Sequence, residues 1–192
     1  MGLDNQKFAE IVEEIRALPV RPDISLVEVP APTRLAPSAF AITAEASDPD
    51  DDSFSGRFVV LHDPDGVDEW QGHYRIVIFF RAVLEPDVLN DDLIRQVAWT
   101  WVQDSTSDLE ITELGGTVTT NFGESFGSLQ DRPSDGFVEV RASWTPVQID
   151  SESPVDNLAQ HLQAWIGCLE LAGGLTPLGD GVTPVSAARR RG

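Results

Sequence analysis

Arginine side chains recur on segments whose alternating pattern predicts β-strands, and they are the groups best suited to bind a ligand. They are Arg57, Arg75, Arg81 and Arg141, four of only ten cations that precede the C-terminal arginine run. Guanidinium groups bind carboxylates and phosphates through paired hydrogen bonds. The pattern therefore suggests a sheet face that takes an anion or an acidic peptide. The interpretation that we favour is local pairing with Glu139, Asp63 or Glu85, which would only hold the sheet together.

Two histidines flank an acidic turn and could serve as an acid, a base or a ligand. His62 and His73 lie on either side of the segment 63–72, on strands that would pair in a hairpin. With the nearby carboxylates they could form a mixed metal site. No dedicated ligand spacing supports this, so we predict neither a metal nor a cofactor. Three aromatic residues, if exposed with the arginine-bearing face, could line a groove or a dimer interface: Trp70, Tyr74 and Trp99.

Other residues with chemical potential lack the context that catalysis needs. The segment 123–127 matches Gly-x-Ser-x-Gly, but no long helix is expected after it to form a nucleophile elbow. Gly115 and Gly116 are not followed by the lysine of a phosphate loop. His161 and Cys168 share a helix face but lie two turns apart, roughly 10 Å, and are expected to pack at the edge of the core. We predict no catalytic residue, and we favour a protein that is not an enzyme.

Hydrophobic periodicity predicts the elements that position these side chains. The expected helices cover residues 4–18, 86–102 and 153–172, with Asp4 as the first cap and a Ser153–Asp156 capping segment before the last helix. The expected strands cover residues 24–29, 40–46, 57–62, 72–84, 109–114, 115–120 and 137–146, with a turn at 63–66.

The pattern indicates a single α+β domain over residues 1–175 and a flexible tail over residues 176–192. We expect a mainly antiparallel sheet with three helices packed against it, in the order α-β(β)ββ-α-ββ-α. In the strand at 72–84 the even-numbered residues from 74 onward are apolar or aromatic, and the odd-numbered residues are apolar in the middle with arginines at intervals. A strand that is apolar on both faces is expected in the centre of the sheet.

Composition and charge exclude several classes of protein. The chain has 192 residues and a net charge of −19, which argues against nucleic acid as the main partner. A hydrophobic content of 41% with five tryptophans argues against a disordered acidic protein. The longest unbroken apolar run is Ile76–Phe80, so we expect no membrane span. A single cysteine and the absence of a signal sequence favour the cytoplasm.

Several short strings resemble those of a family of uncharacterised actinobacterial proteins, a domain of unknown function. The strings are 34–37 (Arg-Leu-Ala-Pro), 61–64 (Leu-His-Asp-Pro), 70–72 (Trp-Gln-Gly), 84–86 (Leu-Glu-Pro), 114–119 (Leu-Gly-Gly-Thr-Val-Thr) and 141–146 (Arg-Ala-Ser-Trp-Thr-Pro). The resemblance spans Phe8 to Leu175 and implies a soluble cytoplasmic protein. The family has no established activity, so it implies no catalytic residue.

The expected order of elements is also similar to the type III secretion chaperone-like fold, if the first short strand is set aside. That resemblance implies a small, acidic, often dimeric protein that binds other proteins, although a fold does not determine a function. Two hypotheses follow. The first is a non-enzymatic binding or regulatory module for a protein or peptide, which we expect to form a homodimer. The alternative is an enzyme or small-anion-binding protein that uses the arginine-bearing face with His62 or His73.

Overall fold

The computed structural model describes residues 2–132, 134–147 and 158–176, which form one antiparallel sheet and its covering helices. The elements are α1 (Gly2–Arg16), β1 (Ile24–Glu28), β2 (Ser38–Ala46), β3 (Phe54–Val67), β4 (Gly72–Val83), α2 (Pro86–Leu89), α3 (Ile94–Ser105), β5 (Ile111–Gly123), the 3₁₀ turn η1 (Gly127–Leu129), β6 (Asp135–Pro146) and α4 (Leu158–Ala172). The predicted α+β fold and its order of elements are confirmed.

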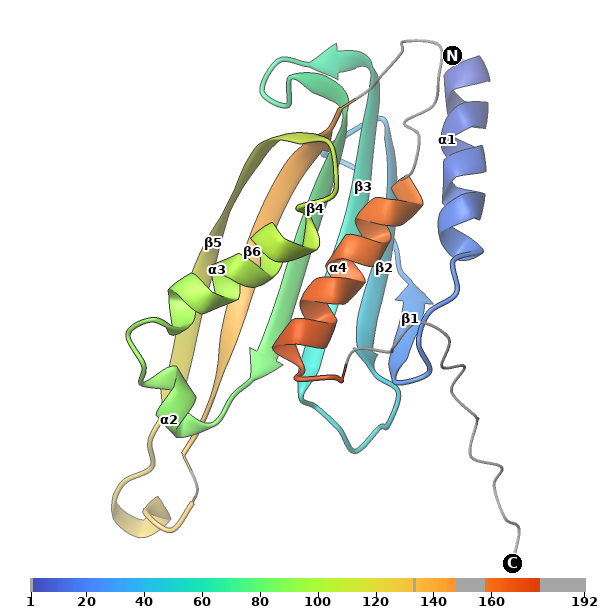
Figure 1. The fold of residues 1–192 in the computed structure, drawn as a ribbon. Coiled ribbons are helices and arrows are strands. Elements are labelled where there is room, and N and C mark those ends of the chain that lie inside the picture. The colour runs from blue at the N-terminus through green and yellow to red at the C-terminus, as the bar shows by residue number, and fades with distance from the viewer. Residues whose placement is uncertain (1, 133, 148–157, 177–192) are drawn as a thin grey trace, which may run out of the picture.

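The sheet has six strands in the order β1-β2-β3-β4-β6-β5, and every neighbouring pair is antiparallel. Strands β1 to β4 follow one another as a meander. The chain then crosses through α2 and α3 and returns as a β5–β6 hairpin whose second strand pairs with β4. Figure 1 shows α1, α3 and α4 on the same side of the sheet.

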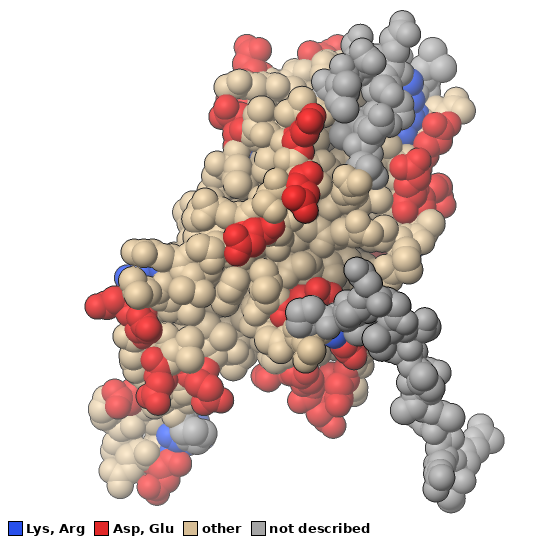
Figure 2. All heavy atoms as spheres, viewed as in Figure 1, with Lys and Arg blue, Asp and Glu red and all other residues tan. Residues whose placement is uncertain are grey.

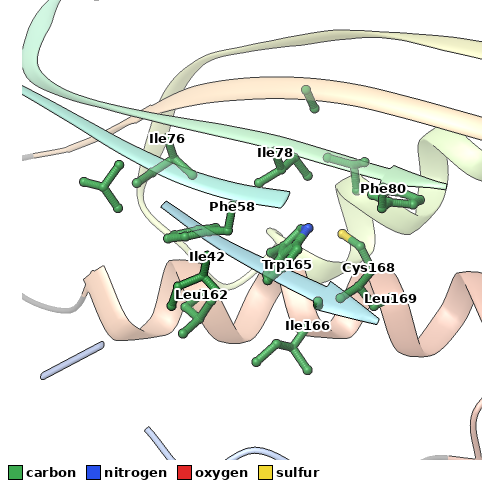
Figure 3. Close-up of a cluster of buried hydrophobic side chains, with 14 of the residues drawn as sticks. Ile42, Phe58, Ile76, Ile78, Phe80, Leu162, Trp165, Ile166, Cys168 and Leu169 are labelled. Carbon is green, nitrogen blue, oxygen red and sulfur yellow. The ribbon is translucent and has the colours of Figure 1, made fainter. Parts of the chain in front are cut away.

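The main core lies between the sheet and these helices. Helix α4 carries no charged residue from Leu158 to Leu169, and it packs its apolar face onto the central strands. Figure 3 shows this contact, with Trp165, Leu162 and Leu169 facing the side chains of β2, β3 and β4. Trp165 and Phe58 are both fully buried, and the centroids of their rings lie 5.7 Å apart.

A smaller apolar cluster lies on the opposite face of the sheet. Ala41, Val59 and Leu61 are buried there beneath Trp70 and the segment 29–36, which connects β1 to β2. Arg57 holds this connection in place, because its Nη2 donates a hydrogen bond to the carbonyl oxygen of Pro30 at 2.8 Å. The face opposite the helices is thus covered over β2 and β3. Beyond β3, the turn before β4 reaches the end of β6, where Thr145 Oγ1 donates a hydrogen bond to the carbonyl oxygen of Trp70. We call that side of β4, β6 and β5 the open half-face.

The structure differs from the sequence prediction at several boundaries. The strand β3 continues to Val67 through an irregularity after His62, and the turn falls at residues 68–71 instead of 63–66. Gln71 accommodates that turn with φ of 55°. The strand β5 is one element instead of two, and a bulge between Thr112 and Gly115 interrupts its pairing with β6.

The helical boundaries also differ. The helix expected over 86–102 is broken into α2 and α3, because the segment between them turns at Asp91, whose Oδ1 accepts a hydrogen bond from the amide of Leu93 at 2.8 Å. Helix α1 begins at Gly2, so Asp4 lies within it and does not cap it. The expected cap at Ser153–Asp156 and the tail from residue 177 lie outside the described residues. In the described part of the chain, no helix is long and apolar enough to cross a membrane.

Candidate functional site

The open half-face carries most of the predicted arginines because of the alternation of strand side chains. In β4 the residues Ile76, Ile78 and Phe80 point into the helix-covered core, so Arg75 and Arg81 point to the other side. Antiparallel pairing places Phe79 opposite Arg141 and Arg81 opposite Glu139. The sequence-predicted arginines of β4 and β6 therefore share one surface.

Two of these arginines lie over aromatic rings. The guanidinium carbon of Arg81 lies 4.0 Å from the ring centroid of Phe137, and that of Arg141 lies 5.3 Å from the centroid of Phe79. Such stacking holds a guanidinium flat on the surface while its N–H groups remain available at its edges. The two phenylalanines were not singled out as site residues from the sequence. The sequence could have indicated them, because alternation along each strand places Phe79 and Phe137 on the same side as the arginines.

One carboxylate serves this pair of arginines. Glu139 Oε1 lies 2.8 Å from Nη2 of Arg141, two positions along the same strand, and Glu139 is also the cross-strand partner of Arg81. Among the described residues Arg81 forms no ion pair, and its Nε is buried there without a hydrogen-bond acceptor. The expected local acid partner is therefore present for Arg141 and is not found for Arg81 in the described part of the chain.

A cavity of about 200 Å³ lies beside Arg81 and Phe137. Its other lining residues are Asp52, Val83, Asn121, Asp135 and Gly136. The two aspartates do not reach Arg81 within ion-pair distance, but their charges would oppose an anion placed in this cavity. The more accessible positive group of the open half-face is Arg141, whose side chain is 58% exposed.

Arg75 acts as a brace between strands. Its Nη1 donates a hydrogen bond to Thr145 Oγ1 at 3.0 Å, and its Nη2 donates to Ser143 Oγ at 2.7 Å. Thr145 in turn donates to the carbonyl oxygen of Trp70 at 2.6 Å. Burial lowers the pKa of Arg75, and the nearby charge of Glu113 partly offsets this effect. Arg75 and Arg57 thus bond to hydroxyl and carbonyl groups of the fold.

The structure separates other residues that the sequence placed with the arginines. His62 is buried on the helix side, between the rings of Phe8 at 5.6 Å and Tyr74 at 4.3 Å. Trp99 also lies on the helix side, against Gly116 of β5. The structure therefore does not place His62, Tyr74 and Trp99 with the arginine face. His62 and Tyr74 alternate to the other side of their strands, and Trp99 belongs to helix α3. Trp70 does lie on the arginine side, but over β3.

His73 lies at the far end of β4 from Arg81. Eight residues separate the two, or roughly 26 Å of extended strand. His73 Nδ1 lies 3.2 Å from the carbonyl oxygen of Asp63, and the ring lines a hollow of about 630 Å³ with Asp65, Asp68 and Gln71. In the described residues no group of three or more His, Cys, Asp or Glu side chains is arranged to hold a metal ion.

A comparison with known protein families identifies the family to which the chain belongs. The family described as "Protein of unknown function (DUF3000)" matches residues 4–183, nearly the whole chain. The chain belongs to this family. The open half-face, the arginine stacks and the hollow at His73 all lie within the matched residues. No curated protein and no solved structure matches the chain.

Proposed function

We propose that this member of DUF3000 is a non-enzymatic binding module that takes an acidic, extended segment of another protein across the open half-face. The observation that carries the proposal is the pair Arg81 and Arg141, each with its guanidinium over a phenylalanine ring, with Glu139 ion-paired to Arg141. A planar cation on an aromatic ring suits a carboxylate ligand, because the ring fixes its orientation and leaves its edge donors free.

The net charge of −19 does not forbid such a partner. At physiological ionic strength the Debye length is about 8 Å, so carboxylates on the helix side are screened from the opposite face. Figure 2 shows that the helix side carries scattered acidic groups and very few basic ones. On the open half-face itself, Asp52 and Asp135 lie beside Arg81, so an acidic segment would gain its charge attraction mainly at the exposed Arg141.

Binding is better supported than catalysis at this face. A reaction at the arginines would need an acid or base beside them, and the sequence offered His62 or His73 for that role. His62 lies on the opposite side of the sheet, and His73 lies near the other end of β4. We expect the module to act in the cytoplasm, in line with its lone cysteine, Cys168.

The proposal is tested by fluorescence anisotropy with a labelled glutamate-rich peptide as the probe. The wild-type chain should bind this peptide and should bind a lysine-rich peptide of the same length much less. The substitution Arg141→Glu should weaken binding of the glutamate-rich peptide by about tenfold or more, because it replaces attraction by repulsion at the most exposed cation. Arg81→Met, which keeps an apolar side chain over Phe137, should weaken binding by a smaller factor.

The matched control is Arg95→Glu, which makes the same charge change on α3, a helix on the other side of the sheet. It should leave the affinity within about twofold of wild type, because Arg95 lies on the helix side of the sheet, where its Nη1 donates to Thr120 Oγ1, and would not touch a peptide on the other face. Equal binding by wild type and Arg141→Glu would refute the proposal. Failure of the wild-type chain to prefer the acidic peptide would refute it as well.

A further inference from the structure

The edge strand β5 is unusual for this acidic chain because a long part of it carries no charge. From Leu114 to Gly123 there are ten residues without a single Asp, Glu, Lys, Arg or Pro. The strand is the last in the sheet order, so no strand in the described part of the chain pairs with the backbone N–H and C=O groups on its outer side. Proteins usually protect such an edge with charges, prolines or short length. None of these devices is present over these ten residues.

The opposite edge of the sheet is protected in the ordinary way. Strand β1 has only five residues, it ends at Glu28, and Pro30 follows two positions later. On β5 the bulge between Thr112 and Gly115 and the positive φ of Glu113, 53°, interrupt only the beginning of the strand. The contrast shows that β5 is the edge left available for pairing.

We propose that β5 pairs with β5 of a second copy of this chain, antiparallel and about a two-fold axis at Val118. This arrangement extends the six-stranded sheet into one continuous sheet across the dimer. It does not rest on the peptide-binding role proposed above, because the pairing uses the backbone at the edge of the sheet, although Thr117 and Thr119 lie opposite Arg141 and Glu139.

The sequence of β5 is self-complementary about this axis. Because side chains alternate, Leu114, Val118 and Phe122 point to the helix side, where Leu114 and Val118 reach the main core. The axis would place Val118 opposite its own copy and Leu114 opposite the partner's Phe122. Phe122 is 40% exposed in the single chain, so this pairing would cover it. On the other side Thr117 would face the partner's Thr119, a pair of β-branched residues that suits a strand.

Charge supports a second copy of the chain as the occupant. Two chains of −19 repel one another over most of their surfaces, so a stable contact needs a charge-free region. Leu114–Gly123 is such a region, and like charges approach only at its two ends, where Glu113 would lie beside Glu124 of the partner subunit. A hydrogen bond also links the segment Leu114–Gly123 to Arg95 on α3, whose Nη1 donates to Thr120 Oγ1 at 3.5 Å. Its positive charge does not add to the repulsion between two acidic chains.

The test is a set of charge variants at Thr117 and Thr119, both exposed, measured by native mass spectrometry and by sedimentation against the chain mass of 21.0 kDa. The wild type should have twice this mass at micromolar concentration. The double variant T117K/T119K places lysines opposite lysines twice across the axis, and should raise the dimer dissociation constant by about tenfold or more. T117E/T119E should do the same.

The mixed variant T117E/T119K identifies the axis. Each glutamate then faces a lysine of the other copy, so the dimer should persist with a dissociation constant within about threefold of wild type. The matched control is S25K/V27K on the opposite edge strand β1, which should remain dimeric. Circular dichroism confirms that every variant is folded.

Hydrogen exchange supplies a second measurement on the wild type. Outward-facing amides between Leu114 and Gly123 should exchange more slowly as the protein concentration rises, since pairing protects them. A monomeric wild type would overturn the proposal and would leave the edge open to a strand from a different protein. A dimer that survives T117K/T119K, or that is lost in T117E/T119K, would also overturn it.

Discussion

Trp144 donates a buried hydrogen bond from its Nε1 to Nδ1 of His161 at 2.9 Å. This contact joins β6 to α4, and it fixes the histidine as the tautomer protonated on Nε2, because Nδ1 must accept. Both residues are at most 4% exposed. Burial lowers the pKa of His161 from its ordinary value of 6.5 to about 4.

The first prediction is that the protein loses stability as pH falls from about 6.5 to 4. In this range the unfolded chain binds a proton at His161 that the folded chain excludes, so the free energy of unfolding decreases as pH falls. The shift corresponds to a loss of roughly 3 kcal/mol below pH 4, and the contribution is zero above 6.5, where both states are neutral. Denaturant unfolding across this pH range measures it.

The control for the first prediction is His161→Gln. Its side-chain carbonyl can still accept the hydrogen bond from Trp144 but cannot titrate, so the stability difference between variant and wild type should change across this pH window. A difference that is constant with pH would contradict the assignment to His161.

The second prediction is that Cys168 of the folded protein is nearly inert to thiol reagents. Burial raises the pKa of this thiol from 9.0 to about 12, and its Sγ lies 3.6 Å from the carbonyl oxygen of Trp101. Three pKa units mean about a thousandfold less thiolate, the form that reacts. Timed alkylation followed by mass spectrometry measures the rate. The same reagent should modify the chain rapidly in denaturant, and a comparable rate in the folded state would show that the thiol is accessible.

The third prediction concerns Gly56, which lies under Trp165. A Cβ atom at Gly56 would lie 2.9 Å from both the carbonyl oxygen of Phe79 and Cζ2 of Trp165. The same carbonyl accepts the Trp165 Nε1 hydrogen bond at 3.2 Å, so neither neighbour can move away without loss. Gly56→Ala should lower the free energy of unfolding by roughly 1–3 kcal/mol, as overpacking does.

Gly115→Ala is the matched control for the third prediction. A Cβ atom there would have no neighbour within 4 Å, so the substitution should change stability by less than about 0.5 kcal/mol. Thermal unfolding of both variants provides the comparison. Equal stability of the two would contradict the close packing of α4 on β3.

Alternation and periodicity are sufficient to predict the main elements and the shared face of the arginines. The two parities of β4 separate Arg75 and Arg81 from the buried residues of the same strand, because successive side chains point to opposite faces. His161 and Cys168, which the sequence predicted at the edge of the core, are both buried. These features follow from local geometry, which the order of residue types determines directly.

The features that were not predicted depend on contacts between distant segments. Strand parity does not show which face the helices cover, so His62 and Tyr74 were grouped with the arginines although they lie in the core. The turn at 68–71 was placed too early because Pro64 and Gly66 are typical turn residues, yet they lie in the irregular part of β3. The stacking of Arg81 on Phe137 requires the pairing of β4 with β6, which sequence spacing does not determine.

The pairing of β4 with β6 also affects how the chain reaches this structure during synthesis. Arg75 and Ser143, which meet across this pair, are 68 residues apart, whereas β1 to β4 pair with their immediate neighbours in sequence. The meander β1 to β4 can therefore assemble first. Until β6 has been synthesised, β4 is an unpaired edge strand that is apolar in the middle of both faces. A chain that stalls before Asp135 would leave this strand unpaired, and we expect such a nascent chain to depend on chaperones and to aggregate when they are absent.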